Sequence, residues 1–426
     1  MSVYNADELQ APDWINNNFL LKVLKQYENT KDIELVHYSI GPASFKGDHY
    51  ASIMFRCKVV YKLIVNQLTK RKSMILKTVP LKDCAKRELL MASNLFETEI
   101  SMYTKALPKI KEILGVYGES SKLYADLIYF ALKPHKIIII EDLCDSGYEV
   151  IRGRLLTEDE IKMVYAKIAK FHAVSYMLAK QEGGENAPII TAYQEGIFSS
   201  SWATSHPMIA NGIQHFKAML AHYKEFYVYL DKVKVMEPAM FAECKNLYRA
   251  FKIKQPETND IFVLNHGDFH PKNLMFKFNK ESNQSEDVIM VDYQASCFAP
   301  STVDMIYSQY MMLGGELLMK RHIFMQYYFE EFVKNLQTIN YCGDIPKYSD
   351  LQISNLKYRH FTLFMLSTFL PIFEAAMHKS VEHMKTLEVS DIMEAPEKLI
   401  DNYYETNFVE ILRKLLPQLL REGYLD

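Results

Sequence analysis

The stretch HGDFHPKN, residues 266–273, constrains the fold more than any other part of the chain. It follows the apolar run IFVLN, which has the length and composition of a buried strand. A second apolar run, VIMVD, ends in Asp292, and the polar segment KESNQSED between the runs predicts a hairpin within residues 261–293. Because a tight return brings the open ends of two strands together, we expect the side chains of Asp268, Asn273 and Asp292 to converge.

Three such side chains have the chemistry of a magnesium-dependent site. Mg²⁺ prefers oxygen ligands and usually takes one or two carboxylates plus substrate phosphates. Asn273 and Asp292 supply an amide oxygen and a carboxylate, which leaves Asp268 to accept a proton from an attacking hydroxyl. This spacing, D-x4-N followed by a later metal-binding Asp, is typical of kinase phosphoryl-transfer sites. Each residue alone also has a structural interpretation: Asp268 as a turn cap, Asn273 as the residue closing that turn, and His266 as a satisfied core histidine.

A phosphoryl-transfer site also needs a cation near the phosphates. Lys77 lies on the apolar strand MILKTVP, and Glu99 on the next helix is expected to pair with it. A solvated edge lysine, with Glu97 competing for the contact, is the alternative. The segment GPASFKGDHYAS, which contains Gly47, can cover phosphates with backbone N–H groups. It does not match GxGxxG and read alone is an ordinary turn, while the absence of GxxxxGK[ST] excludes a Walker-type ATPase.

Hydrophobic periodicity predicts an α+β chain. A helix capped by Asp13 comes first, followed by β-branched and aromatic strands and then by a helix from Cys84 to about Leu107 that Pro108 stops. LYADLIYFAL and KIIIIEDL read as two more strands. The segment TEDE, starting at Thr157, has the form of a capping box and begins a long helix, after which the chain is mostly helical.

Length and charge narrow the class of protein. A chain of 426 residues exceeds one compact core, so two lobes are expected. A net charge of -3 offers no basic field for nucleic acid and favours a small-molecule ligand. Six scattered cysteines without a CxxC pair, an N-terminus without signal-peptide character and the absence of a long apolar run predict a cytoplasmic protein without a membrane span. Nothing indicates a protein partner.

Motifs in order along the chain resemble those of a known family. They are GDHYASIMFRCKV, MILKTVP, FETEISMYTKALP, IIIIEDLCDSGY, AKIAKFHAVS, NHGDFHPKNLMF and VDYQASCFAPSTVDMIY. They are similar to the ecdysteroid kinase-like family, within the choline and aminoglycoside kinase group of the protein-kinase-like superfamily. This resemblance implies a bilobal fold with ATP in the cleft: a small β-rich lobe with one long helix at 1–140, a hinge at 141–145 and a larger, mostly helical lobe at 146–426.

The resemblance also implies roles for individual residues. It makes Asp268 the catalytic base, Asn273 and Asp292 the Mg²⁺ ligands, and Lys77 with its partner Glu99 the phosphate anchor. Nucleotide contacts further fall on the hinge residues Glu141, Asp142 and Leu143, and on Gly47.

Four further residues are expected to support the site. Asp304 would support the catalytic loop, with a helix N-cap as the alternative, and His172 would brace the catalytic segment. His266 would orient the loop, while His270 would face the phosphates or substrate. Two departures are mild: His270 stands where family members often have Trp, and Tyr293 where they commonly have Phe.

The resulting hypothesis is ATP- and Mg²⁺-dependent phosphorylation of a hydroxyl on an ecdysteroid-like or other lipophilic alcohol. Three alternatives stay open: a broad-specificity detoxification kinase, a choline- or ethanolamine-type kinase with an acidic and aromatic cage, and a nucleotide-binding pseudokinase. The content of Tyr, Phe and Met, 28, 24 and 22 residues, suits an apolar groove, although aromatic stripes on helices also form ordinary core.

Overall fold

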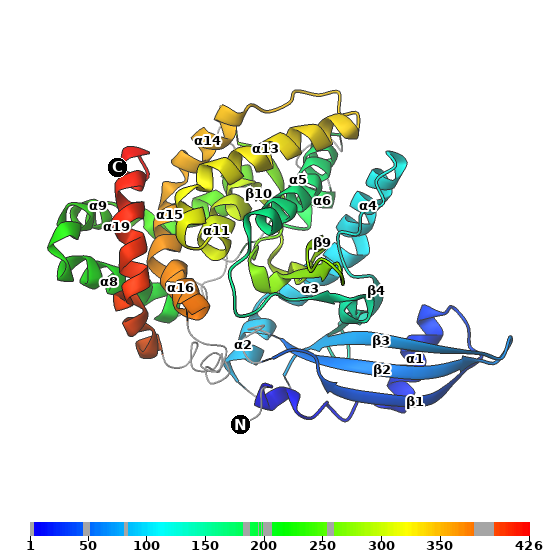
Figure 1. The fold of residues 1–426 in the computed structure, drawn as a ribbon. Coiled ribbons are helices and arrows are strands. Elements are labelled where there is room, and N and C mark those ends of the chain that lie inside the picture. Colours follow the sequence, from blue (N-terminus) through cyan, green and yellow to red (C-terminus); the bar gives the residue numbers. More distant parts are fainter. Residues whose placement is uncertain are drawn as a thin grey trace.

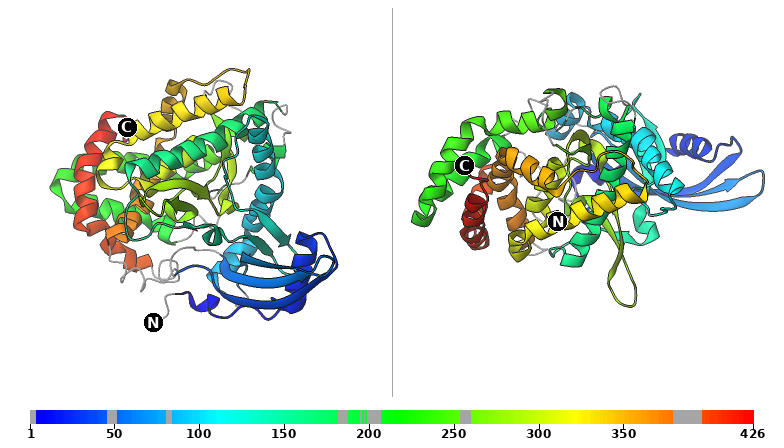
Figure 2. Two further views of the ribbon diagram at one scale, coloured as in Figure 1. Left: turned by 45° about the vertical axis from the view of Figure 1, so that its right-hand side comes forward. Right: turned by 90° about the horizontal axis from the view of Figure 1, so that it is seen from above.

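The computed structural model describes residues 4–45, 52–80, 84–181, 188–194, 196, 198, 207–253, 260–378 and 396–426. The chain has the predicted bilobal α+β architecture, with a β-rich smaller lobe and a larger helical lobe (Figure 1). Figure 2 shows the sheet of the smaller lobe and the C-terminal helix α19 at opposite ends of the molecule. All six cysteines are free.

The smaller lobe contains an antiparallel sheet of five strands in the order β1-β2-β3-β5-β4. The strands are β1 (Ile33–Pro42), β2 (Ile53–Leu63), β3 (Leu68–Thr78), β4 (Leu127–Ala131) and β5 (Ile137–Glu141). Alternate β2 residues such as Phe55 and Cys57 are buried, and α1 (Asn17–Tyr27) packs Leu20 and Val23 into the same core.

The cap of helix α1 lies three residues after Asp13. Asn16 is its cap: the Asn16 side chain accepts N–H bonds from Asn18 at 3.1 Å and Phe19 at 3.2 Å. The Asp13 prediction is therefore wrong, because only its carbonyl oxygen contributes, by accepting a bond from the Asn16 amide at 3.1 Å.

The single helix expected from Cys84 to about Leu107 is broken. It forms α2 (Ala85–Ala92), α3 (Leu95–Ser101) and a π-helical turn, η2 (Met102–Ala106), which runs directly into α4 (Leu107–Val116). Pro108 does not stop the helix, because it lies in the first turn of α4, where no intrahelical N–H bond is required.

Helix α5 (Glu158–Gln181) begins with the predicted capping box. Glu160 N–H donates to Thr157 Oγ1 at 3.3 Å, and Thr157 N–H donates to Glu160 Oε2 at 2.8 Å. In the described part of the larger lobe, the other α-helices are α6 (Pro188–Thr191), α8 (Pro207–His222), α9 (Tyr227–Tyr248), α10 (Ala250–Ile253), α11 (Thr302–Met312), α12 (Gly315–Met319), α13 (Arg321–Thr338), α14 (Tyr348–Lys357), α15 (Arg359–Phe364), α16 (Leu370–His378) and α19 (Thr406–Arg421). Among the helices in these described ranges, none is long and apolar enough to cross a bilayer.

The larger lobe also carries two small sheets that place the HGDFHPKN loop. The predicted hairpin is β8 (Leu274–Phe278) and β9 (Ser285–Met290), and β6 (Tyr148–Glu149) pairs with β8. The IFVLN run forms β7 (Phe262–Asn265), which pairs with β10 (Cys297–Pro300) rather than with the hairpin. The HGDFHPKN loop therefore connects the sheet of β7 and β10 to the sheet of β6, β8 and β9.

Candidate active site

The loop between β7 and β8 depends on a glycine. Gly267 has φ +83°, a backbone conformation that side chains disfavour. A Cβ at this position would lie 2.0 Å from the carbonyl oxygen of Ala295. No other residue therefore fits between the loop and the turn that follows Asp292.

The Asp268 carboxylate is held by three side chains. Oδ1 accepts the Tyr307 hydroxyl at 2.7 Å and lies 3.3 Å from His270 Nε2, and Oδ2 accepts the Asn273 amide at 3.0 Å. Since His270 Nδ1 accepts the Lys272 N–H at 3.2 Å, the ring proton belongs on Nε2, which donates to Asp268. Burial raises the pKa of Asp268, but His270 and Tyr307 outweigh it and hold the pKa below its usual range.

Asn273 and Asp292 are brought together by the hairpin. Val291 N–H donates to the Asn273 carbonyl at 3.0 Å, directly beside the β8–β9 ladder. Asp292 follows with φ 66° and ψ 62°, a left-handed conformation uncommon outside glycine and frequent at functional sites. The Asp268 side chain contacts Asn273 directly, and the bond from Val291 places Asp292 next to Asn273 along the hairpin.

Lys77 on β3 joins the two lobes. Its Nζ lies 2.6 Å from Glu99 Oε2 on α3 and 2.6 Å from Asp292 Oδ1. Glu97, the alternative partner, instead pairs with Lys136 at 2.9 Å. Burial lowers the pKa of Lys77, but the charges of Asp292 and Glu99 reverse this effect and raise it, so the amine stays protonated. One ammonium therefore serves two carboxylates.

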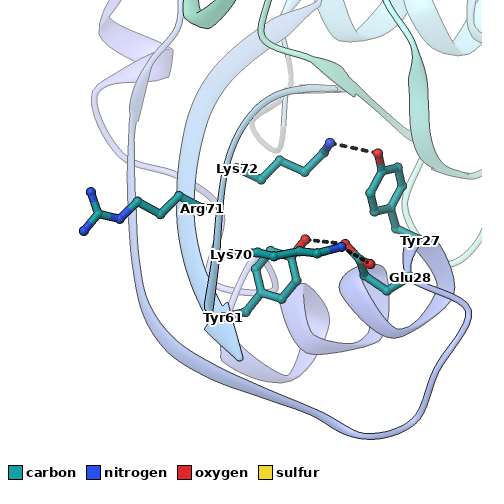
Figure 3. A pocket seen from close by; sticks show the side chains of 6 residues that line it. All are labelled: Tyr27, Glu28, Tyr61, Lys70, Arg71 and Lys72. Carbon is teal, nitrogen blue, oxygen red and sulfur yellow. Dashed lines mark hydrogen bonds and ion pairs between the residues drawn. The ribbon is translucent and has the colours of Figure 1, made fainter. Parts of the chain in front are cut away.

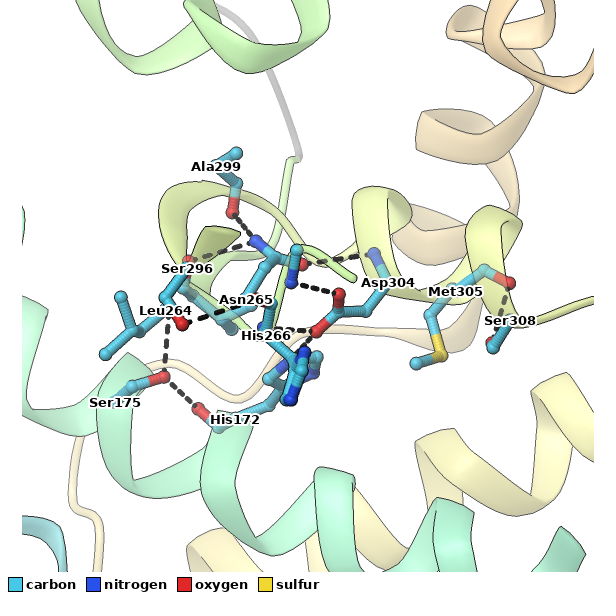
Figure 4. A network of polar contacts seen from close by, with 12 residues as sticks. His172, Ser175, Leu264, Asn265, His266, Ser296, Ala299, Asp304, Met305 and Ser308 are labelled. Atoms are coloured by element: carbon cyan, nitrogen blue, oxygen red, sulfur yellow. Dashed lines mark hydrogen bonds and ion pairs between the residues drawn. The ribbon is translucent and has the colours of Figure 1, made fainter. Parts of the chain in front are cut away.

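Asp304 anchors the backbone of the HGDFHPKN loop (Figure 4). Its Oδ2 accepts the His266 N–H at 2.6 Å, and its Oδ1 accepts the Gly267 N–H at 2.9 Å. His172 Nε2 lies 3.1 Å from the same Oδ2, and His172 Nδ1 contacts the Tyr328 hydroxyl at 2.7 Å. The N-cap of α11 is Ser301, so Asp304 does not occupy the N-cap position that was its alternative interpretation.

The two histidines of the loop contact its backbone. His266 Nε2 donates to the Val291 carbonyl at 2.9 Å, and its Nδ1 accepts the Asp268 N–H at 3.4 Å. His266 therefore connects the loop to the residue before Asp292. His270 caps the short turn η6 (Pro271–Asn273) while its other nitrogen contacts Asp268.

The expected hinge residues use their side chains for structural contacts. Asp142 accepts bonds from Arg56 Nε and Ser73 Oγ, both at 2.7 Å. Glu141 is ion-paired with Lys122 and also accepts the Asp126 N–H at 3.1 Å. Leu143 begins the short helix η3 (Leu143–Ser146), where a first-position N–H has no intrahelical acceptor. The side chains of Glu141 and Asp142 are therefore engaged in contacts within the protein.

Gly47 lies outside the described residues, so its predicted phosphate contact has no structural description. A separate hollow of about 450 Å³ lies on the smaller lobe (Figure 3). Two of its basic residues, Lys70 and Lys72 on β3, contact Glu28 and the Tyr27 hydroxyl, at 2.7 and 2.9 Å, at the end of α1 and not at the site around Lys77.

The site fits a hard cation. Glu99 and Asp292 share the single ammonium of Lys77, which leaves an excess of negative charge at this contact. Asn273 bonds Asp268 through its amide nitrogen, so its amide oxygen remains as a ligand. Gln294 donates to Asp292 Oδ2 at 3.2 Å. Among the described residues, no donor reaches the buried Oε1 of Gln294.

Sequence reasoning missed three contributors to this site. Tyr307 contacts Asp268, Gln294 contacts Asp292, and Arg56 contacts Asp142. Only Tyr307 carried a usable signal, because it follows Asp304 by three positions and three-residue spacing places both on one side of a helix. The other two contacts depend on side-chain directions that a motif does not encode.

The bilobal fold, with a strand lysine paired to a helix carboxylate and an Asp–Asn loop leading into a hairpin, defines a phosphotransferase with an alcohol group as acceptor. The chain belongs to the ecdysteroid kinase-like family, whose profile matches residues 46–341. A search of curated proteins gives no match.

Solved structures of small-molecule kinases are similar to this chain at low sequence identity. An ethanolamine kinase of Plasmodium vivax is 12% identical, with a TM-score of 0.40, covering 98% of this chain and 93% of that chain. The choline kinase LicA of Streptococcus pneumoniae is 11% identical, with a TM-score of 0.32, covering 91% and 99%. The AMP-bound spectinomycin phosphotransferase APH(9)-Ia is 15% identical, with a TM-score of 0.37, covering 91% and 98%. The family assignment rests on the sequence profile alone.

Proposed function

We propose that this protein transfers the γ-phosphoryl group of ATP to a hydroxyl of a small lipophilic alcohol, with an ecdysteroid-like compound as the favoured class. The observation that carries the proposal is the placement of Lys77 Nζ at 2.6 Å from both Glu99 and Asp292, beside the loop that holds Asp268 and Asn273. An anchored cation, a base and two oxygen ligands for a metal are what phosphoryl transfer requires.

In the proposed reaction, Asp268 orients the acceptor hydroxyl and takes its proton as the acceptor oxygen attacks the γ-phosphorus. The bond from that phosphorus to the bridging oxygen breaks, and ADP leaves. Asp268 suits this role because its side chain keeps 28% of its surface exposed while its carboxylate is held in place. A base fixed within reach of the attacking hydroxyl contributes mainly by orientation.

Asn273, Asp292 and the amide oxygen of Gln294 would hold Mg²⁺. The bound ion would offset phosphate charge and align the phosphates. Lys77 contributes a fixed positive charge, and Glu99 keeps its ammonium in position. We also propose that residues 141–145 form the hinge between the two lobes. The backbone groups of Glu141 and Leu143 bind the adenine in this proposal.

The lipophilic class of acceptor is supported by the neighbourhood of Asp268. Tyr307 packs against Phe369 with ring centroids 5.9 Å apart, and Phe369 packs against Phe364 at 5.5 Å. Tyr307 and Phe364 are buried, and Phe369 is the partly exposed ring of the three. A partly exposed aromatic ring beside the residue that contacts the base suits a hydrocarbon skeleton that carries a hydroxyl.

A substrate panel tests the proposal. The purified protein is incubated with ATP and Mg²⁺ and with steroid, phenolic and choline-type alcohols, and phosphorylated products are identified by mass spectrometry. We expect product from the steroid alcohols and only a small residual turnover from the Asp268→Asn variant. Nucleotide-dependent thermal stabilisation without any product would favour a pseudokinase, products from alcohols of every class a detoxification kinase, and choline-type product alone a choline-type kinase.

A further inference from the structure

Tyr307 has a direct contact with the proposed base that none of the assigned roles explains. Its hydroxyl donates to Asp268 Oδ1 at 2.7 Å, and only 7% of the residue is exposed. It lies on α11, three residues after Asp304, which binds the backbone of the same loop through two N–H groups. One helix therefore holds both the backbone of the loop and the side chain of its base.

The hydrogen bonds of Asp268 leave one direction open. An ionised carboxylate has about four lone-pair positions. Tyr307 and His270 occupy Oδ1, and Asn273 occupies one side of Oδ2. The remaining acceptor position lies on Oδ2, and the exposed 28% of the side chain makes the carboxylate reachable.

The Tyr307 ring is held firmly enough to act as a support. It packs against Phe369 at 5.9 Å and lies nearly parallel to His270 at 6.4 Å, with 30° between the planes. The phenol therefore approaches Oδ1 from a fixed direction, while Asn273 contacts Oδ2. A carboxylate held from two sides cannot rotate freely about its terminal bond.

We infer that Tyr307 is a positioning residue: it fixes the Asp268 carboxylate so that Oδ2 faces the acceptor hydroxyl. This inference rests on the proposed function, because it assumes that Asp268 is the base. Tyr307 takes no proton and forms no bond to the substrate. Its contribution is to keep a lone pair aligned with the acceptor O–H, and small misplacements at such a site cost up to about 100-fold in rate.

The Tyr307→Phe variant tests this role, because it keeps the ring and removes only the hydroxyl. We expect kcat to fall about 10- to 100-fold, while KM for ATP and nucleotide-dependent thermal stabilisation change by less than about threefold. If Tyr307 only stabilised the fold, the folded fraction of Tyr307→Phe would keep the kcat of the unmodified protein. Normal kcat, or a rise in KM for ATP as large as the loss in kcat, would overturn the inference.

Tyr165→Phe is the matched control. The buried hydroxyl of Tyr165, on α5, contacts Ser308 Oγ at 3.1 Å. Ser308 lies on α11, directly after Tyr307. This variant also removes one buried phenol hydroxyl from the packing of α11, but it does not touch Asp268. We expect kcat within about twofold of the unmodified protein, so that a larger loss in Tyr307→Phe alone reports the contact with Asp268.

A double-mutant comparison separates this inference from the proposed function. In the Asp268→Asn background, Tyr307→Phe should cause less than about a twofold further change in residual turnover, because Tyr307 acts through the carboxylate. The full Tyr307→Phe loss in that background would overturn the inference. Unchanged turnover in Asp268→Asn itself would instead overturn the proposed function. An inactive Asp268→Asn with a fully active Tyr307→Phe would leave the proposed function standing and remove only the role of Tyr307.

Discussion

Asp304→Asn is the substitution that best tests how the HGDFHPKN loop is held. The Asp304 carboxylate is fully buried and accepts backbone N–H bonds from His266 at 2.6 Å and Gly267 at 2.9 Å. His172 Nε2 lies 3.1 Å from the same carboxylate. Asparagine has almost the same shape, but one of its two terminal atoms becomes an NH₂ donor. That donor must face one of the backbone N–H groups.

The expected cost follows from these contacts. One buried N–H loses its acceptor, which costs about 1–3 kcal/mol. The bonds that remain are no longer charge-assisted and lose roughly half their strength, about 1 kcal/mol more. Because removing a buried charge recovers part of its desolvation cost, we expect the free energy of unfolding to fall by less than the full sum, about 2–3 kcal/mol. A plain helix cap would lose only about 1 kcal/mol.

Urea unfolding, followed by fluorescence and circular dichroism, measures this change. The exposed Asp231→Asn serves as control, since its side chain is 81% exposed and the substitution should cost less than about 0.5 kcal/mol. Amide hydrogen exchange should show faster exchange at residues 266 and 267 in Asp304→Asn. A loss under about 1 kcal/mol, with unchanged protection of those two amides, would refute the reasoning.

Three further substitutions have defined outcomes. Gly267→Ala should lower the free energy of unfolding by about 2–4 kcal/mol in urea titrations, because the added Cβ would lie 2.0 Å from a backbone oxygen. Gly115→Ala is the control: the space around Gly115 is open, so this substitution should not destabilise the protein. Lys77→Met should lower the free energy of unfolding by about 3–5 kcal/mol in the same assay, because it leaves Glu99 buried without its cation. Adding Glu99→Leu to the Lys77→Met variant should restore part of this lost stability. No recovery of stability would contradict the pairing. Burial lowers the pKa of His172 from 6.5, so below that pH the unfolded chain binds a proton that the folded chain excludes. Stability should therefore fall with decreasing pH by up to about 1.4 kcal/mol per unit, and His172→Gln should lose that component of the slope.

The site was more predictable than the elements around it. Asn273 and Asp292 flank the β8–β9 hairpin, and the turn chemistry of a hairpin limits where strand ends point, so their approach follows from local sequence. The placement of Asp268 required the structure, because the strand before it, β7, pairs with β10. The Lys77 and Glu99 pair follows from the order of strand and helix, although the choice between Glu99 and Glu97 required the structure.

Helix boundaries were less predictable because the competing signals are local and weak. Helical periodicity continues through the break between α2 and α3, so it did not reveal the break. Pro108 reads as a stop within an established helix, yet the preceding π-helical turn lets it lie in the first turn of α4. In both cases tertiary packing decides between conformations that the sequence leaves close in free energy.

Burial separates the aspartates of this site into two kinds. Asp304 is fully enclosed and its two oxygens accept backbone bonds, which is the arrangement of a structural carboxylate. Asp268 and Asp292 keep 28% and 19% of their side-chain surfaces exposed, although each is also held by neighbouring side chains. A fold that needed them only for stability would gain nothing from this exposure, because enclosing a paired carboxylate strengthens its hydrogen bonds. The exposed oxygens therefore favour a role in contact with a ligand, and the fully satisfied Asp304 explains how the loop stays fixed while they remain reachable.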